Sequence, residues 1–155
     1  MNTELIFSTG PGPAFDTFCQ GRNYTSVHTL TDSNTATLAL PVLAASSTLL
    51  AEARNWSMPA GEENKNLATL SNLWTELESA GATRRSLLVN IGGGVVTDLG
   101  GFAAATFKRG MDYVNIPTTV LGAVDASFGG KTGIDFGGLK NQIGAFAAPA
   151  ATIIS

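Results

Sequence analysis

The sequence is short of charge: only 14% of its 155 residues are Asp, Glu, Lys or Arg, and the net charge is −3. It contains no block of basic residues, and such a block is the electrostatic footprint of nucleic-acid-binding proteins. No apolar run approaches the roughly 18 residues that a membrane span requires. The first residues also lack the basic start and apolar stretch of a secretory signal. We therefore expect a cytoplasmic protein without a nucleic-acid or membrane partner.

Cysteine and histidine are scarcer still, with one residue of each. Cys19 has no partner for an internal disulfide, which fits a reducing compartment, and we interpret it as inert. His28 has no cysteine or second histidine near it in the sequence, so we interpret it as structural. One histidine and one cysteine cannot build a typical metal site of three or four ligands, so we expect this chain to hold no metal by itself.

Apolar residues, in contrast, are abundant (44%), and their spacing predicts alternating strands and helices. The length allows one core and one domain. Strands separated by helices favour an α/β domain with a mostly parallel sheet that is covered by helices on both faces. The spacing predicts strands at 5–8, 26–30, 48–53, 86–91, 113–117 and 151–155, and helices at 41–45, 64–80 and 95–108.

Polar and glycine residues collect where the expected strands end. These are Asp32, the run Gly92-Gly93-Gly94, and the pair Thr118-Thr119. In open parallel sheets, ligands bind outside the carboxyl ends of the strands. We therefore predict that this edge of the sheet is the functional one.

The three glycines between a strand and a helix form the most informative local feature. Backbone without side chains lets a diphosphate approach, and the start of a helix offers free N–H groups and a positive dipole end. The usual glycine-x-glycine-x-x-glycine fingerprint is not met, because Thr97 occupies its third place. A tight turn without a ligand stays open as an alternative.

A second polar set lies among glycines in the last third of the chain: Asp125, Lys131, Lys140 and Asn141. The segment Gly129-Gly-Lys-Thr resembles the end of a triphosphate-binding loop, but Asp125 stands where that loop needs its first glycine and would repel phosphate. The apolar neighbours of the set favour a functional site over a solvated loop. Upstream, the spacing of Glu62 and Lys65 fits an ordinary ion pair at the start of a helix.

Taken in order, these segments resemble the 3-dehydroquinate synthase family of sugar phosphate cyclases. The resemblance is strongest from Gly92 to Phe146 and weaker but ordered upstream, around Asp32-Ser-Asn and Pro59-Ala-Gly. It is carried by the segments 92–102 (GGGVVTDLGGF), 104–110 (AATFKRG), 116–121 (IPTTVL), 124–133 (VDASFGGKTG) and 140–146 (KNQIGAF).

The resemblance implies a Rossmann-like N-terminal domain that binds NAD, followed by a helical domain that carries the metal. It implies that Asp32 holds the adenosine end of NAD, and that Glu62 and Lys65 contact ribose hydroxyls. The diphosphate would lie along Gly93, Gly94 and Val95. The rest of the cofactor would be fixed near the nicotinamide by Asp98, Thr118, Thr119 and Lys140. The implied substrate contacts are Asp125, Lys131 and Asn141, with Arg109 matching an arginine that positions the substrate phosphate in some members.

The reaction implied by the resemblance converts 3-deoxy-D-arabino-heptulosonate 7-phosphate to 3-dehydroquinate and phosphate in the shikimate pathway. NAD accepts and returns a hydride, and a divalent zinc or cobalt ion polarises the oxidised carbon's oxygen. The implied metal ligands, a glutamate and two histidines, belong to the second domain. We therefore expect this chain alone to be inactive, and the complete enzyme to be a homodimer.

Two residues depart from the family pattern, and three alternatives remain. Thr97 stands where most members have glycine, and Asp135 stands where asparagine is common; Thr97 leaves the geometry at the diphosphate open. The alternatives are another cyclase, of the 2-deoxy-scyllo-inosose or valiolone synthase type, an iron-dependent polyol dehydrogenase, and an NAD-binding module without activity. The dehydrogenase would produce NADH, whereas a cyclase recycles its cofactor.

Overall fold

A computed structural model describes residues 3–127 and 130–155. Phe128 and Gly129, which belong to one of the family-like segments, lie outside the described residues. No helix in the described ranges is both long and apolar enough to cross a membrane.

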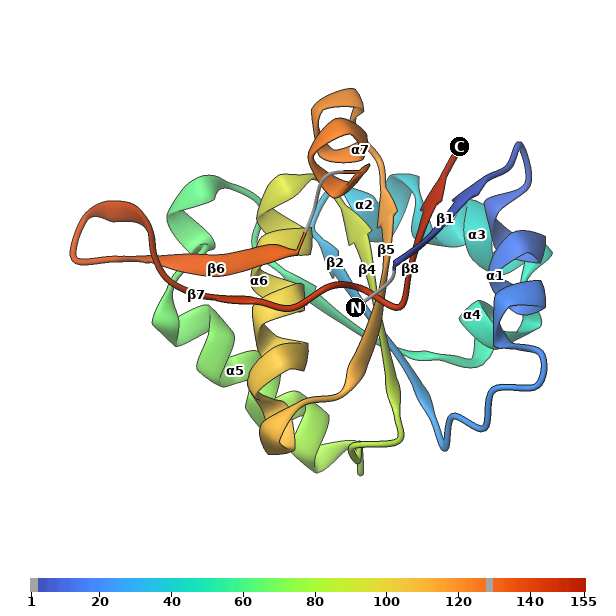
Figure 1. The fold of residues 1–155 in the computed structure, drawn as a ribbon, viewed down its shortest axis with the longest axis horizontal. Coiled ribbons are helices and arrows are strands. Elements are labelled where there is room, and N and C mark those ends of the chain that lie inside the picture. The colour runs from blue at the N-terminus through green and yellow to red at the C-terminus, as the bar shows by residue number, and fades with distance from the viewer. Residues whose placement is uncertain (1–2, 128–129) are drawn as a thin grey trace.

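Six parallel strands form the central sheet (Figure 1). Their spatial order is β1-β8-β5-β4-β2-β3, and every neighbouring pair is parallel. The strands are β1 (Glu4–Phe7), β2 (Val27–Asp32), β3 (Arg54–Met58), β4 (Leu87–Gly92), β5 (Asp112–Pro117) and β8 (Ala151–Ile154). Because all six run the same way, their carboxyl ends meet at one edge.

Helices cover both faces of this sheet, as Figure 1 shows. One face carries α1 (Pro11–Cys19), α3 (Leu40–Ser46) and α4 (Thr48–Glu52), and the other carries α5 (Leu67–Ser79) and α6 (Gly94–Thr106). The remaining helices are α2 (Thr35–Leu38) and α7 (Val120–Ser127), with short 3₁₀ turns η1 (Glu62–Asn64) and η2 (Phe107–Arg109). The expected α/β, Rossmann-like fold is confirmed.

The core lies on both sides of β4, whose six residues are all buried. Leu88 packs with the α5 and α6 side, whereas Leu87, Val89 and Ile91 pack with the α1, α3 and α4 side. This alternation follows from the two-residue period of a strand. Burial on both faces explains why β4 is a continuous apolar run in the sequence.

The direction in which the chain adds successive strands across the sheet reverses between β2 and β4. From β2 the chain moves outward to β3, whereas from β4 it moves the opposite way to β5 and β8. The helices that follow these two strands lie on opposite faces, and we call the part of the carboxyl edge between the two strand ends the crevice. Such a switch point is where open α/β sheets bind their ligands.

An antiparallel hairpin stands apart from the main sheet and lies beside α6 (Figure 1). It consists of β6 (Lys131–Phe136) and β7 (Leu139–Phe146), joined by Gly137 and Gly138. Both glycines have positive φ angles, 62° and 77°, as a two-residue hairpin turn of type I′ requires. The hairpin is absent from the sequence-based prediction, although the Gly-Gly pair between apolar residues was its signal.

The prediction of a strand at 48–53 is wrong. Residues Thr48–Glu52 form helix α4, which begins where the Ser47 side chain accepts a hydrogen bond from the backbone N–H of Leu50 at 3.1 Å. Leu50 is 2% exposed and packs in the core. A short apolar run fits a buried helix turn as well as a strand, and the serine cap decides between them.

Two adjacent glycines allow α6 to lie close to both of its neighbours. A Cβ on Gly100 would lie 1.9 Å from Oδ1 of Asn90 in β4, and one on Gly101 would lie 2.5 Å from Cγ2 of Thr132 in β6. The close helix-to-strand approach therefore occurs at Gly100. The third glycine of the usual fingerprint, replaced by Thr97, is not needed for it.

We predict that Gly100→Ala lowers the free energy of unfolding by about 2 kcal/mol, measured by urea denaturation. The added methyl group displaces Asn90, whose Nδ2 donates to Oδ1 of Asn115 at 3.0 Å in a buried site. The matched control is Gly94→Ala, because a Cβ there meets no atom within 4 Å. Equal stability of the two variants would contradict the close-packing role of Gly100.

Candidate functional site

The N-terminus of α6 opens at the switch point. Gly93 is its N-cap, no side chain caps the helix, and a Cβ on Gly94 would meet open space. The first hydrogen bond within the helix runs from the backbone N–H of Thr97 to the carbonyl of Gly93 at 3.1 Å. The N–H groups of the preceding turn, including those of Gly94 and Val95, are therefore available to an anion.

Thr97 leaves this anion site open. Its hydroxyl lies 3.3 Å from the carbonyl oxygens of both Gly93 and Gly94, so it donates back to its own helix, and the residue is 9% exposed. The threonine thus takes the place of the third fingerprint glycine without projecting into the crevice.

Asp32 lies across the crevice, at the end of β2. Its Oδ1 accepts hydrogen bonds from the backbone N–H groups of Asn34 and Thr35, both at 2.8 Å. The Thr35 hydroxyl in turn donates to the carbonyl of Ile91 at 2.9 Å, which joins the ends of β2 and β4. Among the described residues no donor is bonded to Oδ2 of Asp32, so this oxygen can accept a hydroxyl of a ligand.

Thr118 and Thr119 complete the edge on the β5 side. The backbone N–H of Thr118 donates to the carbonyl of Gly92 at 3.0 Å, and the Thr119 hydroxyl accepts from the N–H of Gly122 at 2.9 Å. A Cβ on Gly93 would lie 3.3 Å from Cγ2 of Thr119. Both threonines are exposed at the mouth of the crevice. The edge residues predicted from the sequence are therefore adjacent.

The Lys65 ammonium is the centre of a second cluster, which we call the Lys65 cluster. Lys65 is only 3% exposed. Its Nζ lies 2.9 Å from Oδ1 of Asn141, 3.1 Å from Oε2 of Glu62, 3.2 Å from Oδ2 of Asp98 and 3.7 Å from Oδ1 of Asp135. The cluster thus joins η1, α6 and both strands of the hairpin. The three closest acceptors match the three donors of an ammonium group.

The cluster perturbs the protonation of two of its members. Burial lowers the pKa of Lys65, but hydrogen bonds to Glu62 and Asp98 and the charge of Asp98 outweigh it, so the pKa lies above 10.5. Burial raises the pKa of Asp98 above 3.8, and the adjacent Lys65 ammonium opposes that rise. Lys65 is therefore charged at neutral pH, and it favours the ionised form of Asp98.

A hollow of about 450 Å³ lies between α6 and the hairpin. Asp98, Lys131 and Asn141 line it, together with Thr132, Gly133, Gly144, Ala145 and Phe146. The fold thus brings together one residue predicted to contact the cofactor and two predicted to contact the substrate. A cation, an amide and a carboxylate can hold a ligand that carries both an anionic group and hydroxyls.

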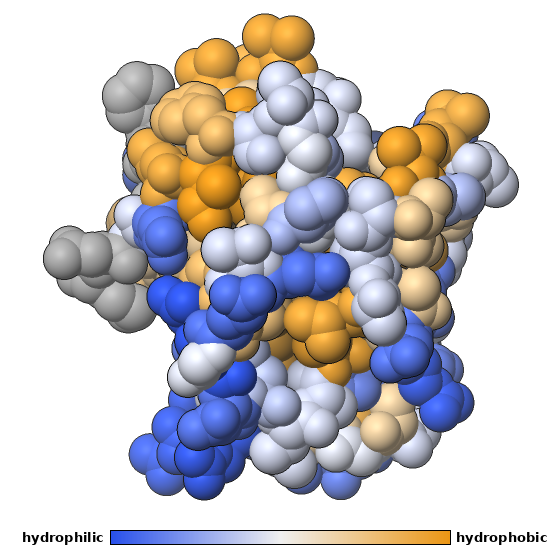
Figure 2. Space-filling view, turned by 90° about the vertical axis from the view of Figure 1, so that its right-hand side faces the viewer, coloured by the Kyte–Doolittle hydropathy of each residue, from blue (hydrophilic) through white to orange (hydrophobic). Residues whose placement is uncertain are grey.

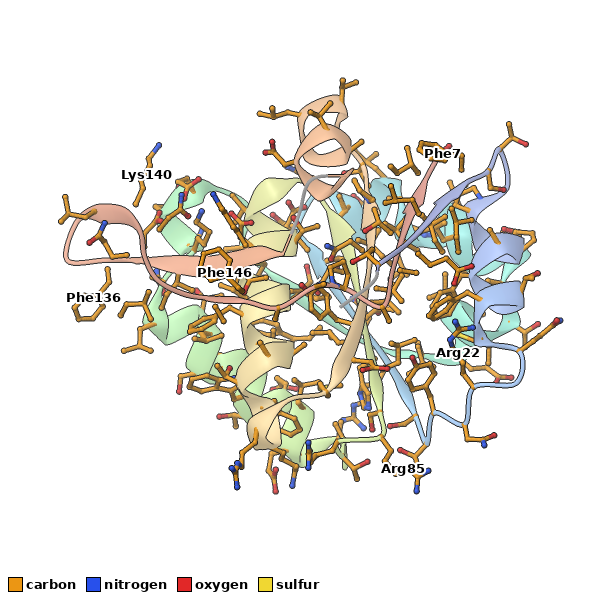
Figure 3. All side chains as sticks on the ribbon, in the orientation of Figure 1. Phe7, Arg22, Arg85, Phe136, Lys140 and Phe146 are labelled. Carbon is orange, nitrogen blue, oxygen red and sulfur yellow. The ribbon has the colours of Figure 1, made fainter. Side chains whose placement is uncertain are left out.

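Lys140 and Asp125 lie beside this hollow rather than in it. Lys140 is exposed and lines a neighbouring hollow of about 340 Å³ with Glu62, Lys65 and Asp135. Figure 3 shows Lys140 near the turn of the hairpin, on the far side from Phe146. Asp125 is exposed on α7, and its negative charge contributes to the raised pKa of Asp98.

Arg109 is the one predicted site residue that the structure places far from the others. It follows the C-terminal end of α6, whose 13 residues span about 20 Å from the carboxyl edge of the sheet to its amino edge. Lys108 and Arg109 both have positive φ angles, 48° and 69°. Arg109 is not among the residues that line the hollow of its own chain.

Asp135 belongs to the site, although the sequence identified it only as a departure from the family pattern. Its Oδ1 accepts a hydrogen bond from the backbone N–H of Asn141 at 2.8 Å, and its own N–H donates to the carbonyl of Lys65 at 2.8 Å. These contacts depend on the hairpin register, which the sequence pattern did not predict.

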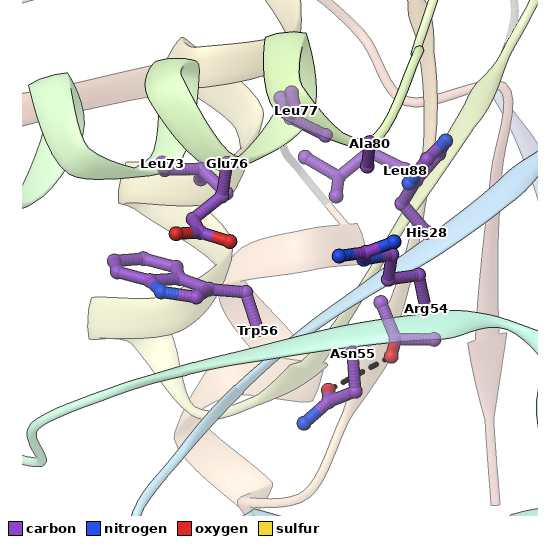
Figure 4. A pocket seen from close by; sticks show the side chains of 10 residues that line it. His28, Arg54, Asn55, Trp56, Leu73, Glu76, Leu77, Ala80 and Leu88 are labelled. Atoms are coloured by element: carbon purple, nitrogen blue, oxygen red, sulfur yellow. Dashed lines mark hydrogen bonds between the residues drawn. The ribbon is translucent and has the colours of Figure 1, made fainter.

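His28 and Cys19 lie away from the edge. His28 is buried beside a small hollow under α5, close to Arg54, Trp56 and Glu76 (Figure 4), and its Nε2 shares a 2.8 Å hydrogen bond with the Ser26 hydroxyl. Burial lowers the pKa of His28. Burial and the charge of Asp16 raise the pKa of the Cys19 thiol to about 11, although Arg22 opposes them. Both residues are neutral at physiological pH.

No group of three or more His, Cys, Asp or Glu side chains within residues 3–127 and 130–155 is arranged to hold a metal ion. The three carboxylates of the Lys65 cluster surround an ammonium group instead.

The sheet order, the uncapped helix at the switch point and the adjoining polar hollow define a Rossmann-like α/β domain with its site at the carboxyl edge. Residues 55–155 match the family described as 3-dehydroquinate synthase N-terminal, and the chain belongs to that family. A 3-dehydroquinate synthase from Parabacteroides distasonis is 47% identical over 137 residues, which are 88% of this chain and 38% of that protein. The chain thus spans about two fifths of the length of this relative.

Solved structures of two other cyclases share the fold. One is a 2-deoxy-scyllo-inosose synthase complexed with carbaglucose-6-phosphate, NAD⁺ and Co²⁺. It superposes with a TM-score of 0.89 and 25% sequence identity, and the match covers 97% of this chain and 41% of that chain. The other is a 2-epi-5-epi-valiolone synthase from Streptomyces hygroscopicus with NAD⁺ and Zn²⁺ bound. It superposes with a TM-score of 0.84 and 26% sequence identity, and the match covers 100% of this chain and 43% of that chain.

We predict that Lys65→Met raises the pKa of Asp98 further, because it removes the ammonium that opposes the effect of burial. An acid whose pKa is raised on folding costs stability when ionised, so the variant should regain stability as the pH falls through the folded-state pKa of Asp98. A carbon-13 NMR titration of the carboxyl group measures the shift. The control is Lys108→Met, which removes an exposed ion pair with Glu78 and a cation–π contact with Phe107, both away from Asp98. An unchanged Asp98 pKa in Lys65→Met would refute the coupling.

Proposed function

We propose that this chain is the NAD-binding part of a 3-dehydroquinate synthase, a lyase that converts 3-deoxy-D-arabino-heptulosonate 7-phosphate to 3-dehydroquinate and phosphate. The observation that carries the proposal is the adjacency of two sites on one helix: α6 begins at an uncapped, glycine-lined anion site and continues to Asp98 in the polar hollow. A dinucleotide phosphate and a reacting sugar phosphate need such neighbouring places.

In this proposal each part of the edge has a role. Oδ2 of Asp32 accepts a ribose hydroxyl at the adenosine end, and the N–H groups of the first turn of α6 bind the diphosphate along Gly93, Gly94 and Val95. Thr118 and Thr119 flank the path from the diphosphate to the nicotinamide. When bound, NAD supplies a reversible hydride acceptor for a carbon of the substrate.

For Lys65, the geometry supports a less direct role than a simple contact with a ribose hydroxyl of NAD. Its ammonium group donates hydrogen bonds to Asn141 and Asp98 and forms an ion pair with Glu62, so a ribose hydroxyl must displace one of these groups or bond to Glu62 instead. Lys140 is exposed at the hairpin and free to turn toward a cofactor. Lys131 balances an anionic group of the substrate, Asn141 binds one of its oxygens, and Asp125 approaches from α7.

We assign the expected zinc or cobalt ion to a helical domain outside these 155 residues; the assignment is supported by the match to only 38% of a 3-dehydroquinate synthase and by the metal ions in the two cyclase structures. Exposed apolar side chains around a hollow of about 680 Å³ at the carboxyl edge suit the packing of such a domain: Phe7, Leu38, Val42, Val120 and Val124. Figure 2 shows hydrophobic surface gathered at this upper edge. We infer that the chain alone is inactive.

We further propose a homodimer and a cytoplasmic location for the complete enzyme. What supports the dimer is that Arg109 does not line the hollow of its own chain. In a homodimer, an arginine of the partner subunit would be available to the substrate phosphate.

Calorimetric titration of the chain with NAD tests the cofactor assignment. We expect saturable binding in the wild type and at least tenfold weaker binding in Gly94→Ala, because the methyl group occupies space that is open in the chain but needed by the diphosphate. Urea denaturation of the same samples supplies the control. No heat from a folded wild-type chain, or equal affinity of the two proteins, would count against the assignment.

Product analysis of the complete enzyme distinguishes the alternatives. A 3-dehydroquinate synthase releases phosphate from the keto-acid phosphate without net formation of NADH. Accumulation of NADH from a polyol would identify a dehydrogenase, and turnover of a different sugar phosphate would identify another cyclase. Phosphate release by the 155-residue chain alone would overturn its proposed inactivity.

A further inference from the structure

Asp135 is one of the residues that join the hairpin to the rest of the site. Its backbone N–H donates to the carbonyl of Lys65 at 2.8 Å, and its Oδ1 lies 3.7 Å from the Lys65 ammonium. The same Oδ1 accepts the backbone N–H of Asn141 at 2.8 Å. One side chain on β6 thus contacts both the loop that carries Lys65 and the facing strand β7.

Asn141 needs such support because its backbone has a φ angle of 55°. This left-handed conformation is uncommon for residues other than glycine, although asparagine tolerates it better than most. A hydrogen bond from an N–H to a carboxylate is stronger than one between neutral groups. The bond to Asp135 therefore stabilises the backbone conformation in which Asn141 is found.

The side chain of Asn141 is held independently by Lys65. An ammonium group can only donate, so the oxygen of the Asn141 amide must face it, at 2.9 Å. The Nδ2 group then remains as a donor of two hydrogens. Because Asn141 lines the hollow with Lys131 and Asp98, this donor is available to an oxygen of a ligand there.

We propose that Asp135 is a positioning residue, which fixes Asn141 so that its amide presents a donor, not an acceptor, to an oxygen-rich anionic ligand in the hollow. The proposal rests on the proposed function only for the identity of that ligand, a sugar phosphate. Asp135 acts through Asn141 and Lys65 and does not line the hollow itself.

The charges around Asp135 favour its ionised form. The groups that face it are Glu62 and Lys65 from the η1 loop, and Lys140 and the Asn141 N–H from β7. The interaction with the Glu62 carboxyl group, followed by the hydrogen bond from the Asn141 N–H and the charges of Lys65 and Lys140, lowers the pKa of Asp135 below its usual value. The carboxylate is therefore available throughout the neutral range, and its support is lost only as the pH falls through that lowered value.

Two substitutions test whether Asp135 acts through its hydrogen-bond acceptor or through its negative charge. Asp135→Asn retains an oxygen that can accept the Asn141 N–H, whereas Asp135→Ala removes it. The control is Glu78→Ala, which removes an exposed carboxylate remote from the hairpin. All four proteins are compared as full 155-residue chains at neutral pH.

Nitrogen-15 NMR reports the position of Asn141 directly. We expect Asp135→Ala to shift both the backbone N–H and the side-chain amide signals of Asn141, Asp135→Asn to leave the side-chain signals close to the wild type, and Glu78→Ala to change neither. Asn141 signals that do not respond to Asp135→Ala would overturn the proposal, as would equal changes in the two Asp135 variants.

Titration with 3-deoxy-D-arabino-heptulosonate 7-phosphate and, separately, with NAD connects this position to binding. We expect Asp135→Ala to weaken the sugar phosphate about fivefold, the effect of one lost hydrogen bond, with rescue in Asp135→Asn and no change for NAD. Failure of NAD to bind the wild type would contradict the proposed function while the NMR result stands. Unaltered affinity for the sugar phosphate in Asp135→Ala would refute the positioning role.

Discussion

The buried ammonium of Lys65 is the interaction on which the shape of the site depends. A two-stranded hairpin is only marginally stable by itself in water, and β7 is exposed along nearly its whole length. Packing of Ile134 into the core and the bonds of Lys65 to Asn141 and Asp98 hold the hairpin against α6. Without that ammonium, three carboxylates would face one another and the hollow beside α6 would lose its outer wall.

The parallel sheet imposes the second constraint. Because every strand of the main sheet ends at the same edge, Asp32, Gly94 and Thr118 become neighbours although they are far apart in the sequence. The same constraint directs the other end of α6 toward the amino edge, and Arg109, which follows that end in η2, does not line the hollow. Adjacency in a sequence motif therefore does not imply adjacency in the site.

The sequence correctly predicted the elements whose apolar residues recur regularly, and it located the edge at which the polar ends of the strands gather. The heptad-like leucines of α5 and the continuous apolar run of β4 gave those elements their correct type, and the polar strand ends located the edge. It failed where a few local contacts decide: the Ser47 cap made α4 a helix, and Gly137-Gly138 made a hairpin of a segment without a predicted structure. The importance of Asp135 follows only from the register that this hairpin creates.

The central claim is that the edge between β2 and β4 binds a dinucleotide along the start of α6. The most direct measurement is to map the backbone amide shifts of the nitrogen-15-labelled chain as NAD is added. We expect shifts concentrated at Asp32, Gly93 to Val95 and Thr118, with the amino edge around Arg54 and Arg85 unaffected. Shifts confined to the amino edge, or spread evenly over the molecule without saturation, would contradict it.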